Sequence, residues 1–138
     1  MTHLIMALLL VVFAGSEPQT NGDAVLGEWL SAKKDTRILI FKEGSVYRGK
    51  VLWGTGSSLK DVKNPDPALR NRDVIGLVIL NGFRFDGDGG WEKGTIYDPR
   101  EGKTYDCKMT IKEDGKLHIR GYVGVSLFGR TEIWTKVN

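Results

Sequence analysis

Few side chains in this sequence have types and spacing that suit catalysis. His118 is the only histidine beyond position 3, and Ser126 with any aspartate makes a nucleophilic triad by residue type alone. Ser126 lacks the Gly-x-Ser-x-Gly turn that exposes such a nucleophile. His118 falls on the outward side of an alternating run, between Leu117 and Ile119. We therefore predict a solvated or cross-strand-paired histidine and no catalytic residues, and an enzyme is the third choice of function.

Metal and thiol chemistry have little support. Zinc normally takes three or four convergent ligands, and this chain has one Cys, two His and scattered carboxylates. Residues 86–90, DGDGG, resemble the start of a calcium loop, but Tyr97 stands where that loop needs glutamate. Cys107 lies on the apolar side of its run, as a small buried hydrophobe does. We predict no metal, no cofactor and a hairpin turn at residues 86–90.

Aromatic side chains are more informative. In a small β-barrel such rings either fill the interior or line a pocket for one small ligand, and both interpretations stay open. Cations at the rim, including Arg48 and Lys50, would meet the acidic head of an amphipathic ligand. The predicted ligand-binding residues are Tyr47, Trp53, Arg70, Arg72, Trp91, Tyr97 and Tyr105.

These residues must be positioned by strands. In residues 103–112 the apolar Tyr105, Cys107, Met109 and Ile111 alternate with polar residues, a period of two that indicates a strand with one buried face. Tyr47, Gly49, Val51 and Trp53 form a second inward set, and the inward set 117, 119 and 121 continues to Val123. Strong turn signals follow at residues 43–44, 99–102 and 114–115.

The count is about eight strands joined mostly by short turns, with residues 75–85 as one of them. This predicts an all-β fold: a single antiparallel up-and-down barrel. Residues 54–72 break the pattern and form a predicted lid loop with one short helical turn, in which Asn64 is the cap and Pro65 the first helical residue.

The N-terminal residues differ from the rest. Residues 4–14 are an apolar run of signal-peptide length, followed by small residues suited to cleavage. We predict a signal peptide at residues 1–16, a flexible leader at 17–24 and the barrel domain at 25–138. The mature protein would then be periplasmic or secreted, with no transmembrane segment. Its net charge of +3 is spread along the chain, which disfavours nucleic-acid binding.

Several motifs together carry a family resemblance: Trp29 and residues 64–70, 94–99, 102–105 and 120–131. They resemble an exported bacterial family catalogued as a domain of unknown function, twenty-one forty-seven in that series. The resemblance implies a lipocalin-like barrel in the periplasm or outside the cell, with no assigned reaction. In lipocalin-like barrels a Gly-x-Trp on the first strand often packs beneath an arginine of the last. That implies a structural pair of Trp29 and Arg130.

The leading hypothesis is an exported, non-enzymatic protein that binds a small apolar or amphipathic ligand in the barrel or at its mouth. The alternative is a structural or protein-interaction module of the cell envelope with a filled barrel, whose protein partner the sequence does not identify.

Overall fold

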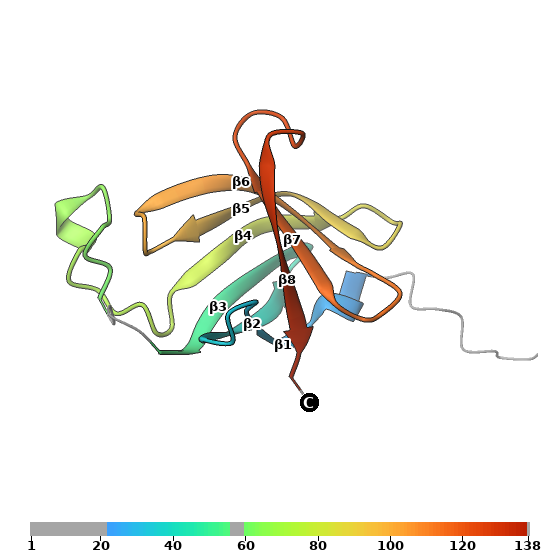
Figure 1. Cartoon of the computed structure of the whole chain (residues 1–138), viewed down its shortest axis with the longest axis horizontal. Helices are drawn as coiled ribbons and strands as arrows, with labels where there is room; N and C mark the ends of the chain where they lie inside the picture. The colour runs from blue at the N-terminus through green and yellow to red at the C-terminus, as the bar shows by residue number, and fades with distance from the viewer. Residues whose placement is uncertain (1–21, 56–59, 138) are drawn as a thin grey trace, which may run out of the picture.

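The computed structural model describes residues 22–55 and 60–137. These form a closed barrel of eight antiparallel strands in chain order (Figure 1), which confirms the predicted up-and-down architecture. The predicted signal peptide and residues 17–21 of the predicted leader lie outside the described residues. The strands are β1 (Gly27–Leu30), β2 (Thr36–Glu43), β3 (Val46–Gly54), β4 (Val78–Phe85), β5 (Gly90–Asp98), β6 (Lys103–Ile111), β7 (Leu117–Tyr122) and β8 (Gly129–Lys136).

Alternation along β6 separates the inside of the barrel from the outside, as predicted. Cys107 and Met109 are buried, whereas Thr104 and Lys108 are exposed. Burial of the inward apolar surface is the main stabilising contribution to such a sheet. The largest fully buried side chains are those of Trp29, Trp91, Phe83, Ile38, Ile40, Leu80, Met109 and Leu117.

One end of the barrel is closed by η1 (Gly22–Val25), a 3₁₀ turn ahead of β1. Trp91 donates its indole Nε1–H to the carbonyl oxygen of Gly22 at 3.1 Å. Tyr47 donates its hydroxyl to Asp23 Oδ1 at 2.8 Å. Residues 22–24, which the sequence assigns to the leader, thus belong to a turn that is hydrogen-bonded to the barrel.

The hairpin between β2 and β3 is displaced by one residue from the prediction. Glu43 pairs with Val46, so the two turn residues are Gly44 and Ser45 rather than Glu43 and Gly44. Gly44 has φ +62°, a backbone conformation that glycine adopts at no steric cost.

The other predicted hairpin turns are confirmed. Asp86 Oδ1 accepts the backbone N–H groups of Asp88 and Gly90 at 2.7 and 3.1 Å, as a turn residue does. Gly102 ends the β5–β6 turn with φ +69°. A Cβ atom at Gly102 would lie 1.9 Å from the carbonyl oxygen of Lys63, so glycine is required where the long loop meets this turn.

The connection between β3 and β4 is longer than predicted. Residues 75–77 precede β4, and Ile75 is exposed. The helical turn η2 (Pro67–Leu69) begins two residues later than predicted, with Asp66 as its N-cap. Asn64 instead accepts the backbone N–H of Asp66 at 2.9 Å, a local turn that competes with helix capping.

The last hairpin ends differently from the prediction. β7 stops at Tyr122, so Val123 does not continue the inward set and is 71% exposed. Residues 123–128 form the β7–β8 loop, which projects beyond the rest of the barrel (Figure 1).

Barrel closure between β1 and β8 involves Lys136 and not Arg130. Trp29 pairs with Lys136, whose Nζ lies 4.7 Å from the centroid of the Trp29 ring. Arg130 pairs with Gly121, six residues away along β8. The predicted pair of Trp29 and Arg130 is therefore wrong, because the register of β8 brings a lysine to the tryptophan.

Candidate ligand-binding cavity

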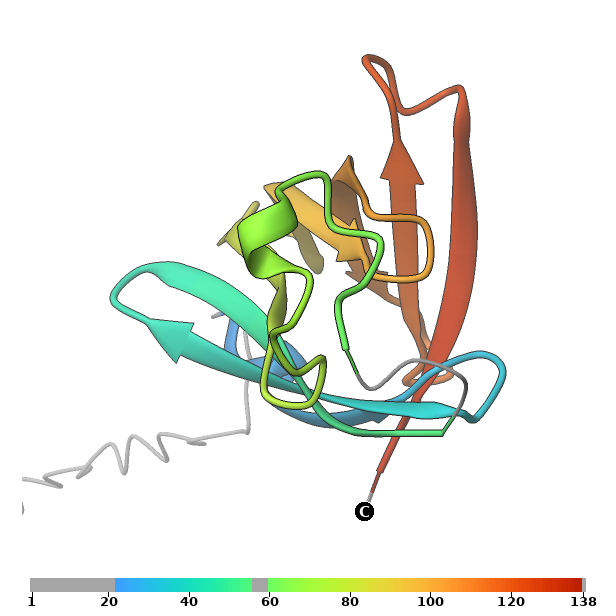
Figure 2. The same ribbon diagram turned by 90° about the vertical axis from the view of Figure 1, so that its left-hand side faces the viewer.

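The barrel is hollow at the end opposite η1. A cavity of about 840 Å³ opens there between the β1–β2, β3–β4, β5–β6 and β7–β8 connections. Figure 2 faces the side of the molecule that carries the long β3–β4 loop, which passes in front of β4 and β5. The apolar part of the lining comes from Ile38, Val51, Val74, Ile79, Ile96, Ile119 and Trp134.

A row of three side chains on β8 leads from the rim of the cavity to its floor. Arg130, Glu132 and Trp134 occupy alternate positions and all line the cavity. Arg130 is exposed, Glu132 is half-buried and Trp134 is buried. A polar rim above an apolar floor is the arrangement that binds an amphipathic molecule in one orientation.

Trp134 brings a polar atom to the apolar floor. Its indole Nε1 is buried and has no hydrogen-bond partner among the residues that the structure describes. By contrast, the indoles of Trp29 and Trp91 donate to the carbonyl oxygens of Val25 and Gly22 at 2.9 and 3.1 Å. A buried donor without an acceptor costs about 1–3 kcal/mol. A ligand that brought an acceptor to Trp134 would offset this cost.

Charges of both signs surround the mouth. Arg100 lies 3.9 Å from Asp35 and 3.6 Å from Asp98. Burial raises the pKa of Asp35, but hydrogen bonds from Ser31 and Thr36 and the charge of Arg100 outweigh it, so the pKa is lowered. The charged lining residues are Lys33, Arg100 and Arg130 against Asp35, Asp98, Glu101 and Glu132. The mouth therefore has no excess of positive charge.

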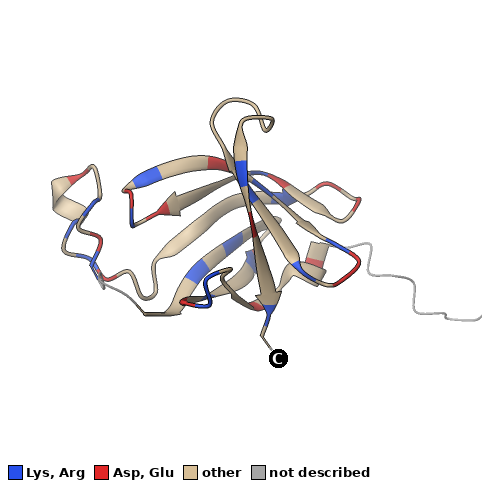
Figure 3. Ribbon diagram, in the orientation of Figure 1, with Lys and Arg blue, Asp and Glu red and all other residues tan. Residues whose placement is uncertain are grey.

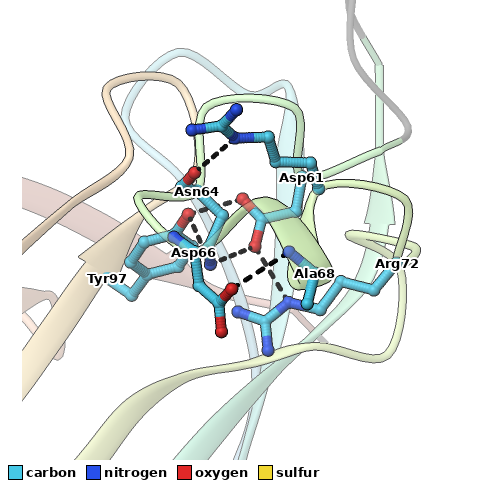
Figure 4. Close-up of polar contacts among 7 residues, drawn as sticks. Asp61, Asn64, Asp66, Ala68, Arg72 and Tyr97 are labelled. Atoms are coloured by element: carbon cyan, nitrogen blue, oxygen red, sulfur yellow. Dashed lines mark hydrogen bonds and ion pairs between the residues drawn. The ribbon is translucent and has the colours of Figure 1, made fainter.

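The long loop is fixed to the barrel by Asp61 (Figure 4). Its Oδ1 accepts a hydrogen bond from the Tyr97 hydroxyl of β5 at 2.5 Å. Its Oδ2 accepts from Asn64 Nδ2 and from Arg72 Nε, each at 2.9 Å. Burial raises the pKa of Asp61, but these hydrogen bonds and the charge of Arg72 lower it by more than burial raises it. The net pKa is below the ordinary value, so the carboxylate is ionised at neutral pH. Within the described residues, the predicted lid is therefore attached to the barrel wall through Asp61.

A smaller cavity of about 330 Å³ lies between this loop and the strands β4 and β5. Asn64 and Arg72 line it from the loop side, and Tyr97 lines both cavities. Tyr97 is thus the residue at which the loop anchor and the large cavity meet.

Two of the predicted ligand-binding residues line the large cavity. Tyr97 and Tyr105 both contribute to its wall, and the Tyr105 hydroxyl donates to Glu101 Oε2 at 2.8 Å. Arg130, predicted as a structural residue, lines the rim of the same cavity. Within the described residues its guanidinium forms no ion pair.

Trp53 lies outside the barrel, which corrects its predicted inward orientation. The register between β2 and β3 shifts at this point: Ile38 pairs with Val51, but Arg37 pairs with Trp53. The extra residue is a β-bulge, and it turns the next side chain to the other face. Trp53 is 44% exposed and lies beneath the Arg37 guanidinium, 5.8 Å from the ring centroid.

The remaining predicted aromatic residues fill the closed end. Tyr47 and Trp91 pack edge-to-face with centroids 6.4 Å apart, and Phe85 lies 5.4 Å from Trp91. Neither Tyr47 nor Trp91 lines a cavity described here. Between the two interpretations of the aromatic set, these rings belong to the filled part of the barrel.

The predicted rim cations have other positions. Arg70 donates its Nε–H to the carbonyl oxygen of Asn64 at 2.8 Å. Arg48 pairs with Glu43 at 3.0 Å, and Lys50 lies over the Phe41 ring, both on the outward side of β3. None of these cations lines the large cavity.

The candidates for chemistry are dispersed. His118 pairs with the half-exposed Ile133 across β7 and β8, on the outer face. Ser126 lies in the β7–β8 loop, and no hydrogen bond joins it to His118 within the described part of the chain. Cys107 is fully buried, and burial raises its pKa to about 12. This confirms the interpretation of Cys107 as a buried hydrophobe.

The chain is similar to known proteins in sequence and in fold. The model of a family described as "Uncharacterized protein conserved in bacteria (DUF2147)" matches residues 27–136. The chain belongs to this family. The match begins at β1 and ends with β8, so in this member the family model corresponds to the closed barrel.

A solved structure has a similar fold. It is protein HP1028 of the human pathogen Helicobacter pylori, described as belonging to the lipocalin family. The two chains are 24% identical, the match covers 82% of each, and the TM-score is 0.74. At this identity the likeness establishes the lipocalin-like fold. No curated protein sequence matches the chain, and in the described residues no helix is long and apolar enough to cross a membrane.

Three residues with roles at these sites were not among the predicted site residues, although Trp134 belongs to the aromatic set expected to fill the barrel or line a pocket. Asp61 lies in a loop sequence without strand alternation, and no motif around it separates it from the other aspartates of the chain. Glu132 and Trp134 follow Arg130 at alternate positions, which was a usable signal for a common face. The sequence gives no comparable signal for the missing hydrogen-bond partner of Trp134.

Proposed function

We propose that this protein binds and carries a small apolar or amphipathic molecule in the large cavity, without catalysing a reaction. The supporting observation is the cavity itself: about 840 Å³ at the open end of the barrel and its mouth, with an apolar floor that contains a buried indole N–H with no partner among the described residues. Pockets for small molecules commonly measure roughly 300–1,000 Å³. Eight-stranded barrels are also wide enough to hold one small ligand, as in lipocalins.

The lining indicates the class of ligand. The body of the molecule is apolar, because isoleucine and valine side chains surround the floor. It carries a hydrogen-bond acceptor, such as a carbonyl or hydroxyl oxygen, that meets Trp134 Nε1. The mouth has three cations and four carboxylates, so it gives no support to a strongly acidic head group. We therefore favour a neutral or zwitterionic polar end over the acidic head expected from the sequence.

The cavity also weighs against the alternative of a fully filled barrel. The rings of Tyr47, Phe85 and Trp91 pack together at the end near η1, whereas the opposite end keeps a space of ligand size. We further propose that the protein acts after export, on the basis of the apolar run at residues 4–14. N-terminal sequencing of the protein from its host tests this, with a start at Glu17 expected.

A cavity-filling substitution tests the carrier proposal directly. Gly121 lines the cavity, and an added Cβ would make only ordinary contacts, the nearest at 3.7 Å. Gly121→Leu would therefore place a side chain in the ligand space, whereas Gly121→Ala would leave that space open. We expect the neutral dye N-phenylnaphthylamine to bind the wild type and Gly121→Ala equally. Gly121→Leu should bind at least about tenfold more weakly, since occluding the site removes apolar burial well above 1.4 kcal/mol.

Equal dye binding by Gly121→Leu would overturn the proposal, provided that circular dichroism shows a folded barrel. Native mass spectrometry of protein purified from its host then identifies the natural ligand class. The bound mass should be displaced by the dye in the wild type and absent from Gly121→Leu.

A further inference from the structure

The β7–β8 loop has an unusual composition for a projecting loop. Residues 121–129 contain no charged side chain, and the loop tip extends away from the barrel as an uncharged segment (Figure 3). Its four large apolar side chains are among the most exposed in the described chain: Val123 71%, Val125 56%, Leu127 78% and Phe128 74%. Contiguous exposed apolar groups of this kind mark an interaction site.

Several backbone groups of this loop have hydrogen-bond partners within the protein. The Arg120 guanidinium donates to the carbonyl oxygens of Ser126 and Leu127 at 2.6 and 3.2 Å. The N–H of Phe128 donates to the carbonyl oxygen of Val125 at 3.2 Å. Since unsatisfied backbone groups prevent a loop from entering an apolar medium, these bonds lower the cost of removing the tip from water.

Charges of both signs lie on the strands at the base of the loop, and the cations outnumber the carboxylates among those nearest to it. Arg120 and Arg130 flank the uncharged segment in sequence, and Lys108 pairs with Arg120 on the neighbouring strand. The nearest carboxylates on these strands are Asp106, which pairs with Tyr122, and Glu132 on the cavity side. An apolar tip above basic residues matches the layers of a bilayer surface, in which acyl chains lie beneath anionic head groups.

We propose that the β7–β8 loop inserts its apolar tip into the interfacial layer of a lipid bilayer and docks the protein there. A bilayer fits this surface better than a protein partner does. Stable protein interfaces bury about 800 Å² on each side and involve roughly 20–30 residues, whereas this tip has six residues on a narrow projection. A bilayer accepts a projecting apolar loop without a complementary surface.

The position of the loop relates docking to the cavity. Val123 and Phe128 belong both to the exposed tip and to the cavity lining. A docked loop would thus bring the cavity mouth close to the acyl layer. The docking proposal does not depend on ligand binding, and each can fail while the other holds.

Vesicle flotation is the first test. The full mature protein is mixed with vesicles of equal parts phosphatidylcholine and phosphatidylglycerol and floated through a density gradient. The wild type should float with the vesicles, and Leu127→Ser combined with Phe128→Ser should lower the bound fraction more than about tenfold. Burial of one such side chain alone is worth more than the 1.4 kcal/mol of a tenfold change. A wild type that stays at the bottom overturns the proposal.

A matched pair of variants tests whether the loop itself makes the contact. Val125→Ser and Val62→Ser make the same change at similarly exposed positions, 56% and 53%, but Val62 lies in the β3–β4 loop. We expect only Val125→Ser to weaken flotation, with melting temperatures unchanged in both. Equal weakening by both variants would contradict insertion of this loop.

A fluorescence measurement tests insertion separately from association. Cys107 is buried, with its pKa raised to about 12, so it does not react with a maleimide dye. A polarity-sensitive dye on Ser126→Cys should shift to the blue on addition of vesicles. The same dye on Ser45→Cys, in the β2–β3 turn at the opposite end, should not shift. The label on Ser126→Cys could instead shift to the blue when the protein self-associates without vesicles, and then not change when vesicles are added. That result would assign the loop to a contact with a second copy of this chain and would overturn bilayer docking.

Discussion

The two ends of this barrel are built from the same alternating strands but differ in what fills them. At the closed end, interior glycines lie against large side chains: a Cβ at Gly49 would come within 2.8 Å of Leu80, and one at Gly94 within 2.5 Å of Phe83. At the open end, a Cβ at Gly121 would have no atom nearer than 3.7 Å. The first end is packed to contact, and the second keeps a cavity of about 840 Å³.

The strand pattern thus determines which side chains point into the barrel, while the size of those side chains determines whether the interior is full. Trp29, Trp91, Phe83 and Tyr47 concentrate near η1, and the polar atoms of the two tryptophans and the tyrosine form hydrogen bonds within the fold. The cavity floor has mainly branched aliphatic residues and one indole whose N–H has no partner in the described part of the chain. Stability should therefore depend mostly on the closed end and ligand binding on the open end.

The largest expected effect is at the closed end. Trp91→Ala removes a side chain that is 1% exposed, together with its hydrogen bond to Gly22. We expect a loss of about 3–5 kcal/mol in the free energy of unfolding, as for large aromatic residues in filled cores. Urea denaturation measures it. A loss below about 1 kcal/mol would show that the closed end is not tightly packed.

The loop anchor should give the next largest effect. Asp61→Asn removes the charge that pairs with Arg72 and weakens the hydrogen bonds of a fully buried carboxylate. Breaking a buried pair costs about 3–5 kcal/mol, but Arg72 is 37% exposed, so solvent screening reduces this to roughly 1–3 kcal/mol. Hydrogen exchange should accelerate in residues 60–72 and not in β6. Asp66→Asn makes the same change at an exposed residue of the same loop and is the control.

The same anchor predicts an acid response. The pKa of Asp61 in the folded protein lies below its ordinary value of 3.8. Its contribution to stability is therefore complete above about pH 3.8 and is lost as the pH falls through the lower folded pKa. Hydrogen exchange of the long loop should rise in that acid range in the wild type. Asp61→Asn should show fast exchange already at neutral pH and no further acid step from this group.

Sequence patterns predicted the barrel because its strands obey a period of two, as β6 does throughout. They failed where one residue interrupts that period. The bulge beside Trp53 turns its ring outward, and Lys93, with φ +62°, lets both Trp91 and Gly94 face inward at an odd spacing. The cavity was not predictable in detail, since it depends on how side chains from several strands meet. Asp61 was missed because its partners come from separate segments of the chain.

Two cations of β8 lie in different places: Lys136 lies where β8 pairs with β1, and Arg130 lies at the rim of the cavity. The Lys136 ammonium lies over Trp29, and burial lowers its pKa. Lys136→Met should cost about 0.5–2 kcal/mol of stability, the range for a cation over an indole ring. Arg130→Ala, at the rim, should leave the melting temperature unchanged. A larger loss of stability in Arg130→Ala than in Lys136→Met would restore the pair expected from the sequence.

The smallest effect on stability should come from the floor of the open end. Trp134→Phe removes a buried N–H that has no partner among the described residues, so the lost ring area is offset by relief of an unpaired donor, and the free energy of unfolding should change by less than about 1 kcal/mol. Trp91→Phe, which removes the hydrogen bond to the Gly22 carbonyl, should cost more.

The same Trp134→Phe variant gives a prediction for ligand binding. A long-chain ketone should bind Trp134→Phe up to about tenfold more weakly than the wild type, because one hydrogen bond contributes roughly 0.5–1.5 kcal/mol. An alkane of equal length should bind both alike, since it offers no acceptor. If the ketone and the alkane respond equally, the indole contributes only surface, and the polar atom at the floor has no part in recognition.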